Sequence, residues 1–124
     1  MKTHKDLEVW KRGIELVNLV YKATKNFPRE ELYGLTNQIR RASVSVPSNI
    51  AEGSARASTK ELIHFLYISL GSLSELETQL IIANNLEYLT SEDLKKFEDK
   101  ITVIIKMLSV LIKTLKNDGR DGEK

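Results

Sequence analysis

Cysteine is absent from this chain of 124 residues, and proline and glycine are scarce, with two and six residues. Without cysteine, disulfide bonds and metal sites built from thiolates are excluded. Long hydrophobic runs are also missing: no stretch approaches the roughly 18 apolar residues of a membrane-spanning helix, and residues 1–13 lack a run of signal-peptide length. We therefore expect a cytoplasmic protein with no membrane partner.

The apolar residues that are present recur every three or four positions, and almost no segment alternates with a period of two. This spacing predicts α-helices rather than strands. We expect helices over about residues 6–25, 29–53, 59–85 and 91–116, in one domain spanning residues 1–117, followed by a disordered tail over residues 118–124. Because the connections are short, successive helices should be antiparallel, which predicts an all-α, up-down-up-down four-helix bundle.

Several residues suit the ends of these helices. Asp6 is a candidate N-cap for the first helix, Pro28 suits the first turn of the second, and Gly53 suits its end. Ser58 and Glu61 have the spacing of a capping box at the start of the third helix. Within the first helix, the apolar stripe at steps of three and four consists of Leu7, Trp10, Ile14, Val17 and Tyr21.

The last helix carries a second group of apolar residues. Val103, Met107 and Val110 are spaced by four and three, and on a helical wheel they lie nearly opposite its main stripe. Scattered surface hydrophobes are common, but the regular spacing favours an interface. On the third helix a row of small residues would let another backbone approach closely, namely Gly71, Ser74 and Thr78. We predict a homo-oligomer.

Glu77 lies within the apolar arc of the third helix, where an unpaired carboxylate would be costly. Arg40 and Arg41 on the second helix are its expected partners. This structural ion pair is favoured over the alternative, a catalytic carboxylate.

The formal net charge is only +2, from 19 Lys and Arg residues against 17 Asp and Glu residues. A nucleic-acid site would therefore have to come from local clustering of basic residues. The candidates, on the first and last helices, are Lys11, Arg12, Lys22, Lys95, Lys106 and Lys113. The alternative is a solvated face in which basic and acidic side chains are interleaved, and the charge pattern alone favours that alternative.

Glu61 and His64 have the Glu-x-x-His spacing of di-iron bundles, but that chemistry needs two such pairs and two further glutamates. The chain has two histidines in all, and it contains neither a nucleophile motif nor a phosphate-binding glycine loop. We expect no catalytic residue, no metal ion and no cofactor, and therefore a protein that is not an enzyme.

Five segments of the chain match the pattern of a known family: residues 6–10 (DLEVW), 33–35 (YGL), 38–42 (QIRRA), 46–53 (VPSNIAEG) and 71–78 (GSLSELET). They resemble the four-helix-bundle proteins of the 23S rRNA intervening-sequence family, which bacteria encode within insertions in ribosomal RNA genes and elsewhere. The resemblance implies a ring-shaped homopentamer without established catalytic activity. The family is also similar to the accessory variability determinant of diversity-generating retroelements, a pentameric barrel that binds nucleic acid and reverse transcriptase through a basic surface.

Two hypotheses follow from the residues and the resemblance together. The first is a non-enzymatic homo-oligomer that contacts RNA, or an RNA-associated protein, through its lysines and arginines. The second is a scaffold for protein–protein interaction that does not bind nucleic acid.

Overall fold

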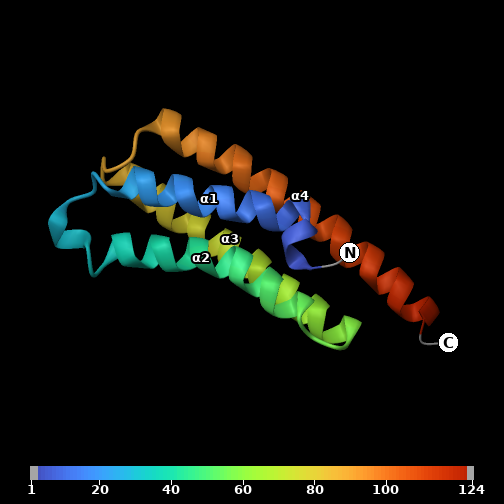
Figure 1. Ribbon diagram of the computed structural model, residues 1–124. Coiled ribbons are helices and arrows are strands. Elements are labelled where there is room, and N and C mark those ends of the chain that lie inside the picture. The colour runs from blue at the N-terminus through green and yellow to red at the C-terminus, as the bar shows by residue number, and fades with distance from the viewer. Residues whose placement is uncertain (1–2, 123–124) are drawn as a thin grey trace.

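The computed structural model describes residues 3–122, in which every regular element is a helix. The long helices are α1 (Glu8–Thr24), α2 (Leu35–Ser54), α3 (Thr59–Asn85) and α4 (Ser91–Gly122), and the short 3-10 helices are η1 (His4–Asp6) and η2 (Arg29–Glu31). Successive long helices run in alternating directions (Figure 1). The prediction of an all-α chain with four helices is confirmed. In this part of the chain, no helix is both long enough and apolar enough to cross a lipid bilayer.

Two helix boundaries differ from those expected. α2 begins at Leu35 rather than near residue 29, because the segment after Pro28 forms η2 and the dihedral angles of Gly34 (φ −113°, ψ −113°) lie outside the helical region. α4 continues to Gly122, whereas the sequence predicted an end near 116 and a disordered tail from 118. Glycine weakens a helix but does not break it sterically. Residues 123 and 124 of the expected tail lie outside the described residues.

Of the two predicted N-caps, the one at Ser58 is present and the one at Asp6 is not. At the start of α3, the Ser58 side chain accepts a hydrogen bond from the Glu61 backbone N–H at 3.1 Å, as a capping residue should. The N-cap of α1 is Leu7, which makes no side-chain capping bond, and not Asp6. Asp6 belongs to η1, and its side chain lies outside the described part of the structure.

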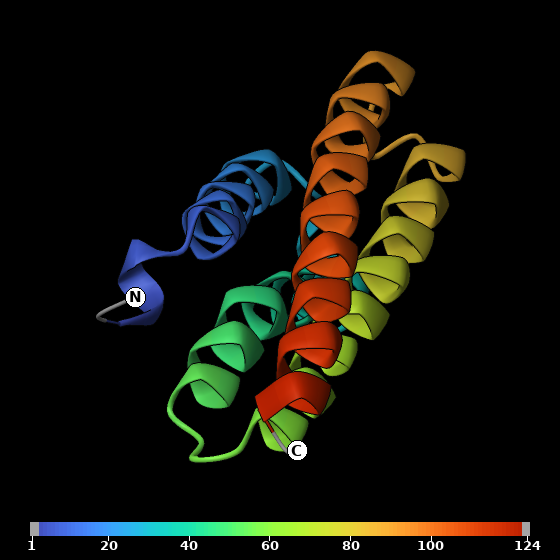
Figure 2. The ribbon, with the colours of Figure 1, turned by 90° about the vertical axis from the view of Figure 1, so that its right-hand side faces the viewer.

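Each long helix packs against two neighbours around one core. α1 neighbours α2 and α4, and α3 neighbours the same two helices, whereas the backbones of α1 and α3 lie diagonally opposite each other across the core. α2 and α3 pack most closely, and α1 and α4 pack least closely, so that α1 stands apart from α4 in the turned view (Figure 2). The largest fully buried side chains are Leu16, Val20, Ile39, Val46, Ile50, Leu66, Leu73, Leu76, Leu80, Ile101, Ile104 and Leu108.

Serine side chains join α2 to α3 inside this closest pair. The Ser69 hydroxyl is fully buried and donates to the Val46 carbonyl oxygen at 2.9 Å. The hydroxyls of Ser45 and Ser72 lie 2.8 Å apart, within hydrogen-bonding distance. Small side chains therefore allow the two helices to approach, and their polar atoms are satisfied by the opposite helix.

The inward face of α1 is not the stripe that the spacing picked out. The core side chains of α1 are Val9, Leu16 and Val20, each at most 3% exposed. The other stripe, which we call the α1 seam, comprises Leu7, Trp10, Ile14, Val17 and Tyr21, and its members are half-buried or exposed. Gly13 accounts for this orientation: a Cβ at Gly13 would lie 3.3 Å from the Cβ of Pro47, so the glycine face is the one that packs on α2.

The predicted ion pair between Glu77 and Arg40 or Arg41 is not formed within the described chain. Arg40 turns toward α1 instead, where its Nε donates to Thr24 Oγ1 at 2.9 Å and its guanidinium lies 4.7 Å from the centre of the Tyr21 ring. Arg41 is exposed and Glu77 is half-buried. A carboxylate that retains contact with water has no need of a buried partner, which is why the expectation was wrong.

A substitution at Thr36 measures how much an unpaired polar atom in the core lowers the free energy of unfolding. Its side chain is 2% exposed, and its Oγ1 has no hydrogen-bond partner among the described residues. Thr36→Val keeps the shape and removes the hydroxyl, so we expect the free energy of unfolding to rise by about 1 kcal/mol. Urea unfolding followed by circular dichroism measures this change. The exposed Thr102→Val should change stability by no more than about 0.5 kcal/mol. A loss of stability in Thr36→Val would contradict the prediction.

Candidate nucleic-acid interface

The predicted basic residues are all exposed and lie on neighbouring helices. Lys11, Arg12 and Lys22 belong to α1, and Lys95, Lys106 and Lys113 belong to α4. α1 packs against α4, and two hollows, of about 210 and 410 Å³, open between these helices. Arg12 and Lys22 line the hollows, whereas Lys113 lines a groove between α3 and α4.

Acidic residues neutralise much of this α1–α4 surface. Arg12 pairs with Glu8 at 3.6 Å. Lys95 pairs with Asp99 at 2.8 Å, and this hydrogen bond raises the pKa of Lys95 above its ordinary value of 10.5. Two further ion pairs join Lys96 to Glu92 at 3.4 Å and Lys100 to Glu15 at 3.9 Å. The surface along the first half of α4 is therefore mixed in charge rather than basic.

The second half of α4 is different, because residues 100–117 contain four lysines and no acidic residue. Lys106 and Lys113 form no ion pair within residues 3–122. Lys116 lies one turn beyond Lys113 and is also exposed. These three side chains, which we call the lysine end of α4, carry charges that no ion pair in residues 3–122 compensates, as do Lys11 and Lys22 on α1.

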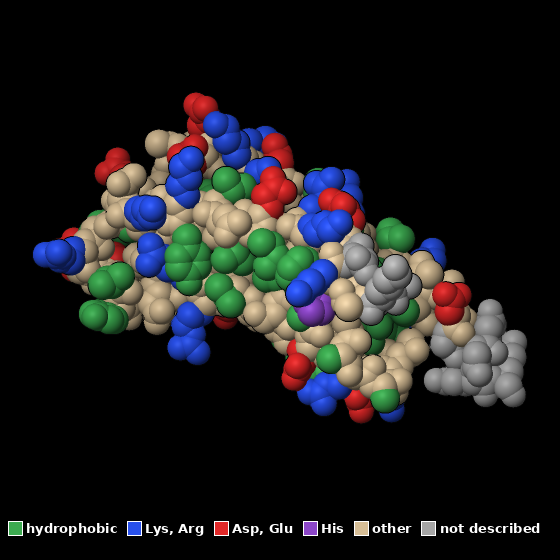
Figure 3. All heavy atoms as spheres, in the orientation of Figure 1, with side chains coloured by type: hydrophobic (Ala, Val, Ile, Leu, Met, Phe, Trp, Pro, Cys, Tyr) green, Lys and Arg blue, Asp and Glu red, His purple; other side chains and the backbone are tan. Residues whose placement is uncertain are grey.

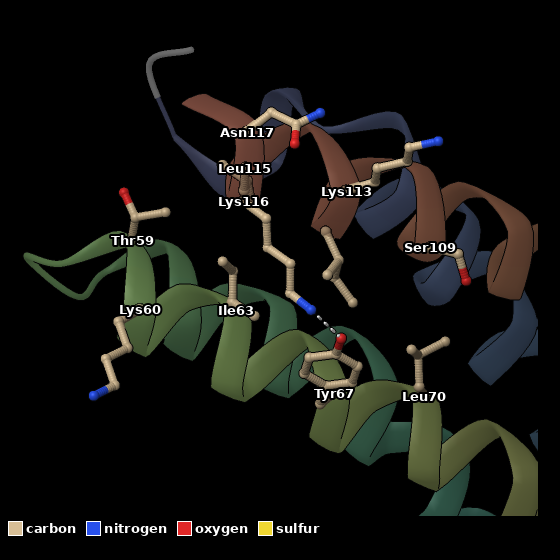
Figure 4. Close-up of a pocket in the computed structure, with 11 residues that line it drawn as sticks. Thr59, Lys60, Ile63, Tyr67, Leu70, Ser109, Lys113, Leu115, Lys116 and Asn117 are labelled. Atoms are coloured by element: carbon tan, nitrogen blue, oxygen red, sulfur yellow. Dashed lines mark hydrogen bonds between the residues drawn. The ribbon is translucent and has the colours of Figure 1, made fainter. Parts of the chain in front are cut away.

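A groove of about 720 Å³ lies beside the lysine end, between the first half of α3 and the last turns of α4. Its lining includes the apolar side chains Ile63, Leu70, Ile112 and Leu115. Lys60 and Lys113 extend outward from its two edges (Figure 4). Thr59, Ser109 and Asn117 supply further polar atoms, and none of the described side chains that line the groove is acidic. The groove is thus apolar within and positively charged at its rim.

Tyr67 gives this groove an exposed aromatic ring. Its side chain on α3 is 48% exposed, and Lys116 reaches across from α4 toward it (Figure 4). Lys116 Nζ donates to the Tyr67 hydroxyl at 2.8 Å and lies 5.2 Å from the ring centre. An aromatic ring beside uncompensated lysines is a combination found in sites that bind unpaired nucleotides, since bases stack on rings and phosphates bind cations.

Three polar residues of this site, Lys60, Tyr67 and Lys116, were not among the candidates drawn from the sequence. Tyr67 and Lys116 are 49 positions apart and meet only because the start of α3 lies beside the end of α4. The antiparallel order of the helices predicts that neighbourhood. It does not predict the groove, which depends on how far the two helices diverge.

The residues predicted to form an oligomer interface lie at the surface, with one exception. Val103 and Val110 are 40% and 65% exposed, whereas Met107 is half-buried against the core. The small residues on α3 are exposed as well. A Cβ built at Gly71 would meet no atom within 4 Å, so the space above this part of α3 is open.

His64 is exposed, and its ring lies edge-on to Phe65 with the ring centres 5.6 Å apart. Within residues 3–122, no three His, Asp or Glu side chains come together in a way that could hold a metal ion. The Glu61 and His64 pair therefore has no companions in the described bundle.

Comparison with known proteins agrees with this architecture. A family model described as 23S rRNA-intervening sequence protein matches residues 5–110. A crystal structure from Bacteroides thetaiotaomicron, of a protein with unknown function from the S23 ribosomal protein family, is similar with a TM-score of 0.76 and 28% sequence identity. The alignment covers 85% of this chain and 98% of that one. No curated protein shows significant similarity. The chain therefore belongs to the 23S rRNA-intervening sequence protein family.

Proposed function

We propose that this protein is a non-enzymatic, cytoplasmic homo-oligomer, a ring-shaped pentamer, that binds RNA or an RNA–protein assembly through the lysine end of α4. The proposal of RNA binding rests on the stretch of α4 from residue 100 to 117, which has four lysines and no acidic residue. This stretch borders the groove that contains Tyr67. The description of the family, which refers to intervening sequences of 23S rRNA, supports an RNA context. The pentamer rests on the resemblance to ring-forming relatives.

The physical basis of such binding is the exchange of small cations for lysine side chains. RNA carries one negative charge per phosphate and holds a shell of condensed cations, which are released when lysines replace them. Lys106 and Lys113 are available for this exchange, whereas Lys95 and Lys96 already face Asp99 and Glu92. Binding should therefore depend on the second half of α4 more than on the first.

Salt titration with paired variants tests the RNA proposal. We expect the wild type to bind structured RNA at low salt and to lose affinity as salt rises. Lys106→Gln combined with Lys113→Gln should reduce the slope of log K against log salt by about 1.5, since each phosphate contact contributes roughly 0.7–0.9. Fluorescence anisotropy with labelled RNA over a range of salt concentrations measures the slope.

The matched control removes two lysines that already have acidic partners. Lys95→Gln combined with Lys96→Gln makes the same change in net charge, but we expect the slope to stay within about 0.5 of the wild-type value. If the two double variants reduced the slope equally, binding would depend on net charge alone, and the proposal that the lysine end binds RNA would be wrong. No binding at low salt would refute the RNA proposal.

The second candidate function is a protein-interaction scaffold, favoured by the aliphatic lining of the groove and by Val110, which is 65% exposed. A protein partner held by apolar contacts would bind with an affinity that changes little with salt. The same titration, carried out with cellular RNA and with protein extract, distinguishes the two candidates.

A further inference from the structure

The α1 seam leaves Ile14 and Tyr21 exposed on the single chain, with the Trp10 ring packed against His4 at one end and Arg40 over the Tyr21 ring at the other. Its five residues follow each other at steps of three, four, three and four, which is the spacing of a seam between two packed helices. Ile14 and Tyr21 are 36% and 40% exposed, and Val44 of α2, 38% exposed, lies on the adjoining helix. Figure 3 shows hydrophobic side chains gathered over the face that α1 and α2 present, with Lys and Arg along its borders. Patches of this kind commonly mark contacts with other macromolecules.

A second row of residues with the same spacing lies on the exposed face of α3. Its members are Gly71, Ser74, Thr78 and Ile81, and we call this set the α3 row. The first three are small, and the space above Gly71 is open. Large residues on one helix pack closely against small residues on another, because the distance between helix axes depends on the side chains at the contact. The bulky α1 seam and the small α3 row therefore match in period and complement each other in volume.

The charges beside the two surfaces are also complementary. Lys25 and Arg41 are exposed on the α1–α2 side, and neither forms an ion pair within the described chain. The acidic residues of α1, Glu8 and Glu15, are engaged by Arg12 and Lys100. Next to Ser74 in the α3 row is Glu75, which is exposed and has no ion-pair partner in residues 3–122. Glu75 beside the α3 row and Lys25 and Arg41 on the α1–α2 side therefore carry opposite charges that are unpaired within the described chain.

We propose that the α1 seam of one copy packs against the α3 row of the next copy. This inference rests on the proposed homo-oligomer and assigns the two faces that hold it together. α1 and α3 occupy non-adjacent, diagonal positions in the bundle (Figure 2), so their outward faces point away from each other within one chain. The contact therefore joins different surfaces of successive copies, and such head-to-tail contacts generate a ring when the rotation closes.

Two variants test the inference from opposite sides of the contact. Gly71→Gln places a side chain in space that is open in the single chain, and Ile14→Glu places a charge in the α1 seam. We expect each variant to keep its helical content while its assembly weakens by about tenfold or more. Light scattering coupled to gel filtration gives the particle mass, and circular dichroism gives the helix content. Thr102→Gln, on an exposed part of α4, is the matched control and should leave the mass unchanged.

Mixing the two variants gives the decisive result. Gly71→Gln retains a working α1 seam, and Ile14→Glu retains a working α3 row. At a concentration where each variant alone is a single copy, an equimolar mixture should form a dimer of one molecule of each, because only one productive contact remains. A contact that pairs two α1 seams would give no mixed dimer, and that result would overturn the proposal.

The mass of the wild type separates this inference from the proposed function. If the wild type is a single copy at micromolar concentration, both fail. If it is assembled, and Val110→Glu dissociates it while Gly71→Gln and Ile14→Glu do not, the oligomer stands and the assignment of faces is refuted.

Discussion

Leu76→Ala is expected to lower the free energy of unfolding by about 2–5 kcal/mol. Leu76 lies on the inward face of α3 and is fully buried, so its truncation removes apolar contacts and leaves a cavity that the neighbouring helices can fill only in part. For a domain of this size such a loss is a large part of the total stability. Urea unfolding followed by far-ultraviolet circular dichroism measures the change.

Leu32→Ala makes the same chemical change at a surface position. Leu32 is 43% exposed, and we expect its truncation to cost about 1 kcal/mol or less. If the two variants lost equal stability, the inward face assigned to α3 would be wrong.

Gly53→Ala is expected to destabilise the chain by about 1–3 kcal/mol, although alanine is the better helix former. A Cβ at Gly53 would lie 2.8 Å from the Phe65 Cβ and 3.2 Å from the Leu62 carbonyl oxygen. Neither atom is the free end of a flexible side chain, so α2 and α3 would have to separate where they pack most closely. Thermal unfolding followed by circular dichroism measures the loss.

Gly71→Ala provides the opposite case, since its new Cβ meets no atom within 4 Å in the single chain. We expect a gain of about 0.5–1 kcal/mol from the lower conformational entropy of the unfolded chain. Both variants are best compared at the lowest workable protein concentration, where association contributes least. Stabilisation by Gly53→Ala would show that α2 and α3 can separate without loss.

The four helices could be predicted from sequence because their apolar period is strong, but the orientation of α1 could not. Two stripes on this helix satisfy a spacing of three and four, one containing Leu16 and Val20 and the other Ile14 and Tyr21. The larger residues belong to the stripe that stays outside. What decides between the stripes is the close approach of Gly13 to Pro47, a contact between residues 34 positions apart that no local pattern reveals.

The candidate site was predictable in its charges and not in its shape. The absence of acidic residues between Lys100 and Asp118 is visible in the sequence, and Lys106 and Lys113 were identified there. The ion pair between Lys95 and Asp99, which compensates the charge of Lys95, follows from i, i+4 spacing and could also have been predicted. The position of Tyr67 could not, because it requires knowing which turn of α3 lies beside Lys116.

The uneven charge of α4 has a geometric consequence for any cyclic particle built from this chain. Rotation about a single axis keeps equivalent atoms of all copies at one height along that axis. The ammonium groups of Lys106, Lys113 and Lys116 would consequently be repeated as circles of positive charge, while the acid-containing first turns of each α4 would be repeated as circles of their own. A polyanion would then meet many weak cationic sites at once, held at fixed separations by the symmetry, and could be retained even though each copy has a net charge of only +2.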